Sequence, residues 1–218
     1  MVSRVSGASL LVRAVVLGSV LGAAVLVACG GSSSNAGDGT SGSAIDDAGK
    51  DRRFIGQMHP AASCPVTLES FDTSGTRNHV PEGTMVTYSS NPPCCGDHYP
   101  VWANYQEFTV TPDDGYLVHS LEHGAIELLY KCTGAACDPI LTELRKIRDA
   151  VATDPACDPS VRVRIIIAPY PKLDVPVAAS AWGFTYKAQC VDVPTLTQFI
   201  KDNYAKGPED LCAPGRTF

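Results

Sequence analysis

Hydrophobic and polar residues alternate most regularly in the second half of the chain, where three runs predict β-strands. Ala125–Lys131 places every second residue on one apolar face, which is typical of a half-buried strand. Val161–Ala168 is the run richest in β-branched residues and predicts a central strand of a sheet. Ala178–Lys187, which carries Trp182, predicts a third strand.

Two segments in the same half have the spacing of amphipathic helices. Asp138 suits the N-cap of the first and Pro139 its first helical position, and this helix should end near Ala152. Its apolar positions are Ile140, Leu141, Leu144, Ile147 and Val151. Pro194–Ala205 predicts a closing helix. Its inward positions are Leu196, Phe199, Ile200 and Tyr204.

The first half of the chain has weaker patterns. Thr84–Ser89 and Glu107–Val110 are β-prone, and a turn follows at 111–115. Prolines are frequent in this part, at positions 60, 65, 81, 92, 93 and 100. We therefore predict an α+β fold in a single disulfide-stabilised domain, residues 52–218. It has a central mixed sheet, two main helices and a loop-rich N-terminal third. The first strand, helix and strand form a βαβ unit with parallel strands.

The N-terminus predicts a lipid anchor. Residues 1–28 have a basic start and an apolar stretch too short to span a bilayer, as in a signal peptide. The end of this segment, Leu26–Gly30, resembles the lipobox of bacterial lipoproteins, which implies that Cys29 is acylated. Membrane lipid is then a partner, and residues 29–51 form a flexible Gly/Ser linker. The alternative is an ordinary secretory signal with an incidental cysteine.

The anchor predicts an extracytoplasmic protein. Gly30 is not the aspartate associated with retention in the inner membrane, which favours the outer membrane if the cell has one. The net charge is −6 and the basic residues are scattered, so we expect no nucleic-acid partner.

The cysteine content fits an oxidising compartment. Nine cysteines less the lipidated one leave eight, and Cys132 and Cys137 are the easiest pair to bridge. Because a bridge between neighbouring residues is strained, we expect Cys94 and Cys95 each to pair elsewhere. Their available partners are Cys64, Cys157, Cys190 and Cys212.

The densest candidate chemistry is the run from His119 to Gly124, with Glu122 and His123 inside it. On a helical turn His119 and His123 share a face about 5–6 Å apart, close enough to hold one metal ion. On a strand they would lie about 13 Å apart, too far for one ion. The hypothesis requires a turn, and Gly124 is a natural residue to end one.

Three motifs together resemble a bacterial family catalogued as domain of unknown function 3105. They are Asn91-Pro92-Pro93, Gly96-x-His98-Tyr99-Pro100 and His119-Ser120-Leu121-Glu122-His123-Gly124, with His79-Val80 at an earlier family position. The resemblance covers roughly residues 79–209 and implies no activity. Cys94-Cys95 stands where the family usually has Thr-Ser, which implies additional disulfides in this member.

The leading hypothesis is a metal-binding lipoprotein that coordinates copper or zinc. Three or four imidazoles would be the ligands, from the set His79, His98, His119 and His123. Glu122 would lie outside the ligand set and accept a ring N–H from one of them. Met58 and Met85 could add thioether ligands that favour copper(I). The alternative is that the histidines only pack in the core.

Two further hypotheses remain open. His119–His123 matches the His-x-x-Glu-His motif of zinc hydrolases, with Glu209 as a distant third ligand, although Gly124 ends the helix that this motif needs. A His/Glu pair could also catalyse hydrolysis without metal. The other class is an envelope interaction module, with an aromatic patch of Tyr99, Pro100, Trp102 and Tyr105. We expect binding rather than catalysis.

Overall fold

The computed structural model describes residues 62–218, which form an α+β fold with a five-stranded mixed sheet, as predicted. The strands are β1 (Val66–Ser70), β2 (Ile126–Tyr130), β3 (Ile165–Pro169), β4 (Val177–Ala181) and β5 (Phe184–Ala188). The helices are α1 (Asp114–Glu122), α2 (Cys137–Ala150) and α3 (Val193–Asn203). The strand order is β1-β5-β4-β2-β3, and only β2 and β3 are parallel. The predicted parallel pair around α2 is thereby confirmed.

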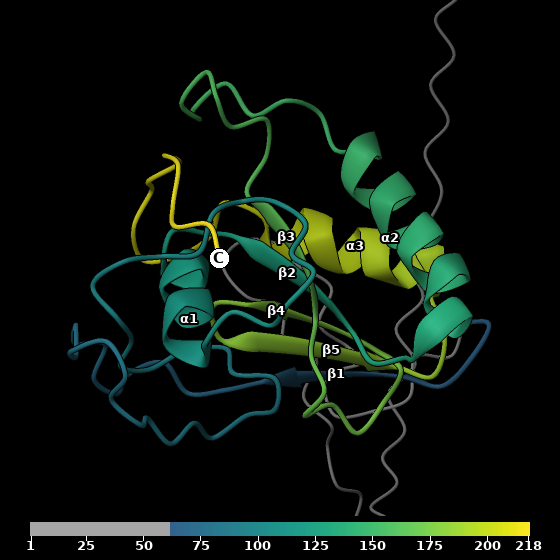
Figure 1. The fold of residues 1–218 in the computed structure, drawn as a ribbon, viewed down its shortest axis with the longest axis horizontal. Coiled ribbons are helices and arrows are strands. Elements are labelled where there is room, and N and C mark those ends of the chain that lie inside the picture. Colours follow the sequence, from purple (N-terminus) through teal and green to yellow (C-terminus); the bar gives the residue numbers. More distant parts are fainter. Residues whose placement is uncertain (1–61) are drawn as a thin grey trace, which may run out of the picture. The chain divides into compact units, whose positions relative to one another are not determined.

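The sheet lies between two layers, with α2 and α3 on one face and α1 on the other (Figure 1). Strand β2 shows the division, because successive side chains alternate between the faces. Ile126 and Leu128 pack in the α2/α3 core, whereas Leu129 packs in the α1 core. All five residues of β2 are buried, so the strand predicted as half-buried is covered on both faces.

Strand β3 is an edge strand, and the prediction that it is central was wrong. Its burial has a different cause, because an irregular segment covers its outer edge. The Phe108 amide donates to the Ile167 carbonyl at 2.8 Å, and the Ile167 amide donates to Gln106 at 3.1 Å. The predicted strand Glu107–Val110 is reduced to this single bridge, and Thr84–Ser89 forms no strand.

The run predicted as one strand around Trp182 is a hairpin of β4 and β5. Trp182 and Gly183 form its turn, and Gly183 has a φ of +79°, which glycine adopts without strain. Helix α2 begins one residue before the predicted cap Asp138, after a short 3₁₀ turn. Helix α3 is capped by Asp192, whose carboxylate accepts from the Thr195 amide at 3.0 Å.

Three disulfides join described residues: Cys64–Cys190, Cys132–Cys137 and Cys157–Cys212. The Cys132–Cys137 prediction is confirmed. The expectation for Cys94 and Cys95 was wrong, because their four expected partners bridge one another. Both thiols are free among residues 62–218.

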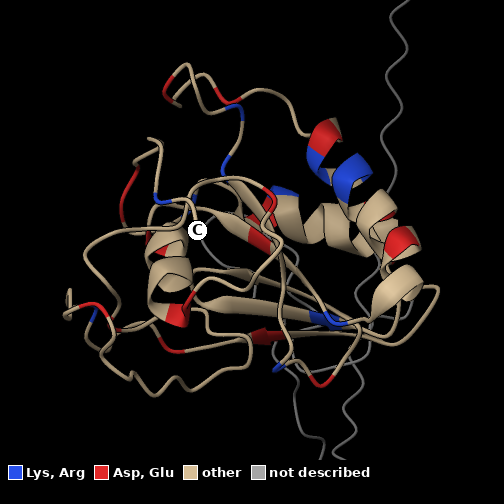
Figure 2. Cartoon of the chain, in the orientation of Figure 1, with Lys and Arg blue, Asp and Glu red and all other residues tan. Residues whose placement is uncertain are grey.

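Charged residues of both signs lie side by side along α2 (Figure 2). Lys146 pairs with Glu143 on the helix, and Arg145 pairs with Glu107 on the segment that covers β3. Within the described part of the chain no helix combines the length and apolarity needed to cross a membrane. The predicted signal peptide, the acylated Cys29, the linker and Met58 lie outside the described residues.

Candidate metal centre

Helix α1 carries the central motif and ends inside it. His119 and Glu122 lie in its last turn, and His123 is the C-cap residue. Gly124 follows with a φ of +78°, and a Cβ there would lie 2.7 Å from the Ala205 Cα. Glycine is therefore needed both for the backbone conformation and for the close approach of the C-terminal segment. The helical turn that the metal hypothesis requires is present.

Two loops bring the other pair of histidines to this helix. His79 and His98 form an isolated parallel bridge. Around it the Val80 amide donates to the His98 carbonyl at 2.8 Å, and the His98 amide donates to Asn78 at 3.0 Å. The two imidazole centroids are 5.1 Å apart as a result.

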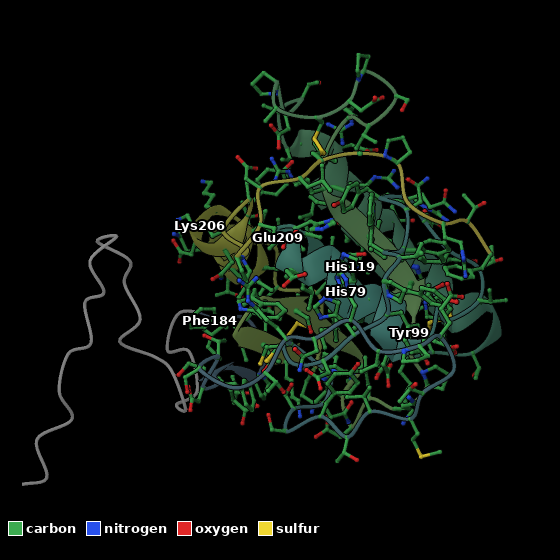
Figure 3. All side chains as sticks on the ribbon, turned by 90° about the vertical axis from the view of Figure 1, so that its left-hand side faces the viewer. His79, Tyr99, His119, Phe184, Lys206 and Glu209 are labelled. Atoms are coloured by element: carbon green, nitrogen blue, oxygen red, sulfur yellow. A yellow bond between two sulfur atoms is a disulfide. The ribbon has the colours of Figure 1, made fainter. Side chains whose placement is uncertain are left out.

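The loops and the helix converge on one group of side chains. One ligand atom from each member lies within 4.8 Å of all the others, and the members are His79, His98, His119 and Glu122. His79 and His119 lie next to each other in Figure 3. His98 and His119 are buried, whereas His79 is exposed, so the group has one open side.

Backbone carbonyls fix which nitrogen of each buried ring carries the proton. His119 Nδ1 is 2.6 Å from the Tyr99 carbonyl oxygen, and His98 Nδ1 is 2.8 Å from that of Gly96. A carbonyl oxygen only accepts, so both Nδ1 atoms must donate. The Nε2 atoms of both rings then point to other side chains of the motif, that of His98 to Glu122 and that of His119 to His123.

This arrangement places the Nε2 atom of His98 against a carboxylate. His98 Nε2 is 2.9 Å from Glu122 Oε2. The other oxygen, Glu122 Oε1, accepts from the Arg77 guanidinium at 2.9 Å. A contact between a ring nitrogen and a carboxylate oxygen at this distance is favourable when a proton or a metal ion lies between the two atoms.

The histidines of the motif are neutral near pH 7. Burial, together with the neighbouring rings of His123 and His98, lowers the pKa of His119 to about 3. Burial, together with the neighbouring His98 and Arg164 side chains, lowers the pKa of His123 to about 4. The neutral imidazole is the form that binds a metal.

His123 connects this group to a second one. Its Nε2 is 3.2 Å from His119 Nε2 and 3.4 Å from Glu209 Oε2, and its Nδ1 is buried without a partner among residues 62–218. Glu122, His123 and Glu209 also have ligand atoms within 4.8 Å of one another. Glu209 is half-exposed and lies near His79 and His119 in Figure 3.

The segment 205–212 places Glu209 over the end of α1. The Ala205 amide donates to Gly124 at 2.8 Å, and the Glu209 amide donates to Glu122 at 3.0 Å. Gly207 is required for this contact, because a Cβ there would lie 2.1 Å from the Glu122 carbonyl oxygen.

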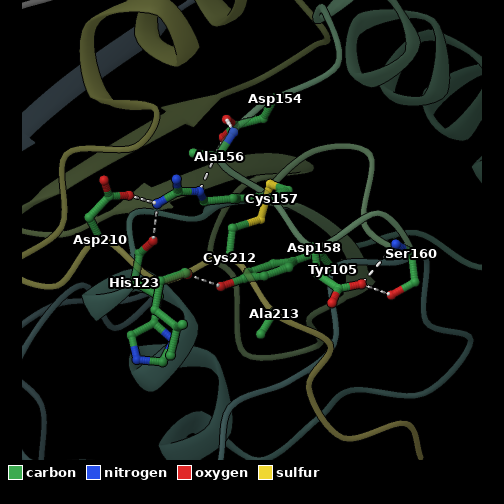
Figure 4. The surroundings of a disulfide bond; sticks show 12 residues. Tyr105, His123, Asp154, Ala156, Cys157, Asp158, Ser160, Asp210, Cys212 and Ala213 are labelled. Carbon is green, nitrogen blue, oxygen red and sulfur yellow. Dashed lines mark hydrogen bonds and ion pairs between the residues drawn. A yellow bond between two sulfur atoms is a disulfide. The ribbon is translucent and has the colours of Figure 1, made fainter.

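A buried arginine fixes the same segment. Arg164 donates to the His123 carbonyl at 3.0 Å and pairs with Asp210 at 2.7 Å and Asp154 at 3.2 Å. The Cys157–Cys212 disulfide lies beside these residues (Figure 4). The sequence analysis did not single out Arg164 or Arg77. An arginine inside the apolar run 161–168 was a detectable signal for Arg164, whereas Arg77 had none.

The residues of the predicted aromatic patch differ in exposure. Tyr99 is buried in the α1 core. The centroid of the Trp102 ring lies 5.4 Å from that of His119 and 4.7 Å from that of His123. Tyr105 is partly buried and Pro100 is exposed. Met85 is 95% exposed, so its sulfur is not packed against the buried histidines.

The comparisons with known proteins identify a family without an assigned activity. A family model described as "Protein of unknown function (DUF3105)" matches residues 79–214, more than half of the chain. This range contains both groups of candidate ligands. Searches of curated proteins and of solved structures found no match.

Proposed function

The chain belongs to the DUF3105 family, and from that premise we propose that it binds a divalent metal ion, zinc or copper, through a buried histidine cluster. The proposed ligands are His79, His98, His119 and Glu122. The observation that carries the proposal is the convergence of these four side chains, since one ligand atom from each lies within 4.8 Å of all the others. A metal ion beside His98 Nε2 and Glu122 Oε2, which are 2.9 Å apart, would form a coordinate bond with each of them.

The dimensions of the cluster support this proposal. Zinc–nitrogen bonds are about 2.0–2.1 Å long, so two ligands of a tetrahedral ion lie roughly 3.3 Å apart. The contact between two of the proposed ligands, His98 Nε2 and Glu122 Oε2, is close to that value at 2.9 Å. The two carbonyl-bound Nδ1–H groups are the usual outer contacts that orient metal-ligating imidazoles.

In this ligand set Glu122 takes the place that the sequence-based hypothesis gave to His123. Glu122 supplies one oxygen to the ion, and its other oxygen forms an ion pair with Arg77 at 2.9 Å. His123 then lies beside the ion and contacts its ligand His119. Exchange of Glu122 and His123 between these roles is the main alternative within the proposal.

The donor atoms favour zinc or copper(II) over copper(I). Imidazole and carboxylate suit both divalent ions, whereas copper(I) prefers sulfur. Met85 points to solvent, and Met58 lies outside the described residues. Comparison of the two affinities by competition with a chelator would identify the preferred ion.

The test is metal analysis of the full chain, purified in detergent without metal-affinity resin. We expect one zinc or copper ion per chain and loss of most of it in His119→Ala. His59→Ala is the matched control, because His59 lies outside the family match and should leave the content unchanged. Absence of tight zinc and copper binding in the wild type, or full binding by His119→Ala, would contradict the proposal.

A second pair of variants separates the two ligand assignments. Loss of an outer hydrogen-bond partner weakens metal binding by about 10–100-fold. If Glu122 is a ligand, the loss of metal affinity in Glu122→Gln should exceed that range. The loss in His123→Ala should then fall within it. The reverse order would restore the sequence-based set with His123 as the ligand.

Binding is favoured over peptide hydrolysis by the depth of the cluster. His98, His119, Glu122 and His123 are all at most 3% exposed, so a polypeptide could approach the cluster only from the open side at His79. The nearby Glu209 does fit the distant third ligand of the hydrolase hypothesis. Release of fragments from an unstructured protein by the zinc-loaded chain, absent in Glu209→Gln, would favour that hypothesis instead.

The anchor remains part of the proposed function. Acylation of Cys29 would hold the domain at the outer surface of a bacterial membrane through residues 29–51. Labelling of cells with a clickable fatty acid tests it. We expect label on the wild type and none on Cys29→Ser, and equal labelling of both would exclude the lipobox.

A further inference from the structure

Two neighbouring thiols remain free in a domain whose other cysteines are bridged. Between residues 62 and 218 six cysteines form three disulfides, and Cys94 and Cys95 take part in none of them. Their sulfur atoms are 3.4 Å apart and share one hydrogen bond. A bond between them requires the sulfurs to approach from 3.4 Å to about 2.05 Å.

The two thiols differ in their access to solvent. Cys94 is completely buried, and its carbonyl accepts from the Gly183 amide in the β4–β5 turn at 3.0 Å. Cys95 is partly exposed and lines a cavity of about 230 Å³. Tyr88 and Trp182 form part of the cavity wall. A reagent that enters the cavity therefore reaches Cys95 first.

Their electrostatics differ in the same sense. The hydrogen bond from Cys94 lowers the pKa of the Cys95 thiol, since it stabilises the thiolate. The same bond and burial raise the pKa of Cys94 well above its usual range. The accessible sulfur is thus the one that ionises more easily, and the thiolate is the reactive form.

We propose that Cys94 and Cys95 form a dithiol that exchanges with disulfides of other molecules, in which Cys95 attacks and Cys94 resolves. The Cys95 thiolate bonds to one sulfur of the incoming disulfide and breaks its S–S bond. The first thiolate leaves and takes up a proton. Cys94 then loses its proton and bonds to Cys95 Sγ, which expels the second thiolate. Two electrons and two protons pass to the substrate, and the protein gains one disulfide.

The product explains why the exchange is reversible. A bridge between adjacent residues closes a ring that includes the peptide bond between them, and such a bridge is strained. Strained disulfides are more oxidising than structural ones and are the ones used in exchange. The oxidised pair can thus oxidise another dithiol and return to its reduced form. The three other disulfides stay intact during this exchange.

The proposal is independent of metal binding, although the two sites share a loop. Gly96, whose carbonyl orients His98, directly follows Cys95. Cys95 is not a member of either group of candidate metal ligands. Removal of metal therefore should not abolish the exchange.

The test uses glutathione with the full chain in detergent. Protein treated with reduced glutathione, so that only the 94–95 pair is reduced, is mixed with oxidised glutathione. Alkylation and peptide mapping then locate each disulfide. We expect the wild type to form the 94–95 bridge and to release two reduced glutathione molecules for each oxidised one.

Single variants separate the two roles. Cys94→Ser should trap one glutathione on Cys95, whereas Cys95→Ser should react at least tenfold more slowly, since Cys94 is buried. An unreactive wild type, equal rates for both variants, or a preferred adduct on Cys94 would overturn the proposal. Retention of the three other disulfides and of the wild-type circular dichroism spectrum shows that each variant is folded.

Discussion

The α2/α3 face of the sheet buries apolar side chains apart from the cap of α3 and Asn203, whereas the α1 face buries imidazoles and carboxyl groups. Leu144 and Leu128 are typical of the first face. On the α1 face, the core contains Leu117 and Leu129. Two residues from each of them in the sequence, His119 and Glu127 are also buried, at most 3% exposed. Buried polar groups without full pairing reduce stability, so their concentration on one face indicates a functional requirement there.

Removal of a buried leucine should have the largest effect on stability and none on the metal centre. Leu144→Ala deletes a fully buried side chain between α2 and the sheet, and such a change costs about 2–5 kcal/mol. Urea unfolding of the metal-free protein measures the loss. Metal content under folding conditions should equal that of the wild type, and a reduced content would mean that the two faces are coupled.

Metal removal should have the next largest effect and act only through the α1 face. An ion at about one hundred times its dissociation constant stabilises the folded chain by about 2.7 kcal/mol. A chelator should lower the unfolding midpoint accordingly in the wild type and in Leu144→Ala. His119→Ala is the control, and an equal chelator effect in that variant would place the stabilising ion elsewhere.

Loss of the α3 cap should have a smaller effect. Asp192 accepts hydrogen bonds from the Thr195 amide and from Ser63, and replacement of an N-cap aspartate by alanine costs about 0.5–2 kcal/mol. Asp192→Ala should show this loss in urea unfolding at pH 7. Asp202→Ala, on the exposed side of the same helix, is the matched control and should stay within about 0.5 kcal/mol of the wild type.

Substitution of Glu127 should mainly change how the free energy of unfolding varies with pH. It should change the free energy of unfolding at low pH much less. Burial raises the pKa of this carboxyl well above its ordinary value of 4.5, and the nearby charge of Asp114 raises it further. A raised folded-state pKa gives stability that is complete below the unfolded value and declines as pH rises through the folded value. Glu127→Gln should remove that decline.

The measurement is urea unfolding between pH 4.5 and 8. Near pH 4.5 the variant should lie within about 1 kcal/mol of the wild type, the size of one hydrogen bond. At higher pH the variant should become the more stable of the two. Parallel curves would show that Glu127 does not titrate on unfolding in this range.

The elements predicted correctly are those with strong local patterns. Strand β2 and helices α2 and α3 follow from apolar spacing, and Gly124 correctly predicted a helical turn that ends at the motif. The edge position of β3 could not be predicted, because its cover is a segment some sixty residues earlier in the chain. The hairpin turn at Trp182 was missed since the residues on both sides of it are equally β-prone.

The candidate site was predictable in its residue types and less so in its geometry. The spacing of His119 and His123 is local, and His79 and His98 came from the family resemblance. The contact of Glu122 with His98 depends on how two loops pair, which local spacing does not encode. For the same reason the partners of Arg164, which holds the segment over α1, emerged only from the three-dimensional structure.

The segment 205–212 has a consequence for biosynthesis. A chain is synthesised from its N-terminus, so Glu209 and Cys212 leave the ribosome after helix α1 and after both histidine loops. Until then the end of α1 lacks the hydrogen bonds from the Ala205 and Glu209 amides, and the Cys157–Cys212 bridge cannot close. A nascent chain that stalls after α3 lacks Asp210, the partner of Arg164, and leaves the end of the motif open to water. The centre can therefore be completed only after segment 205–212 has been made, and closure of the disulfide beside it requires an oxidant.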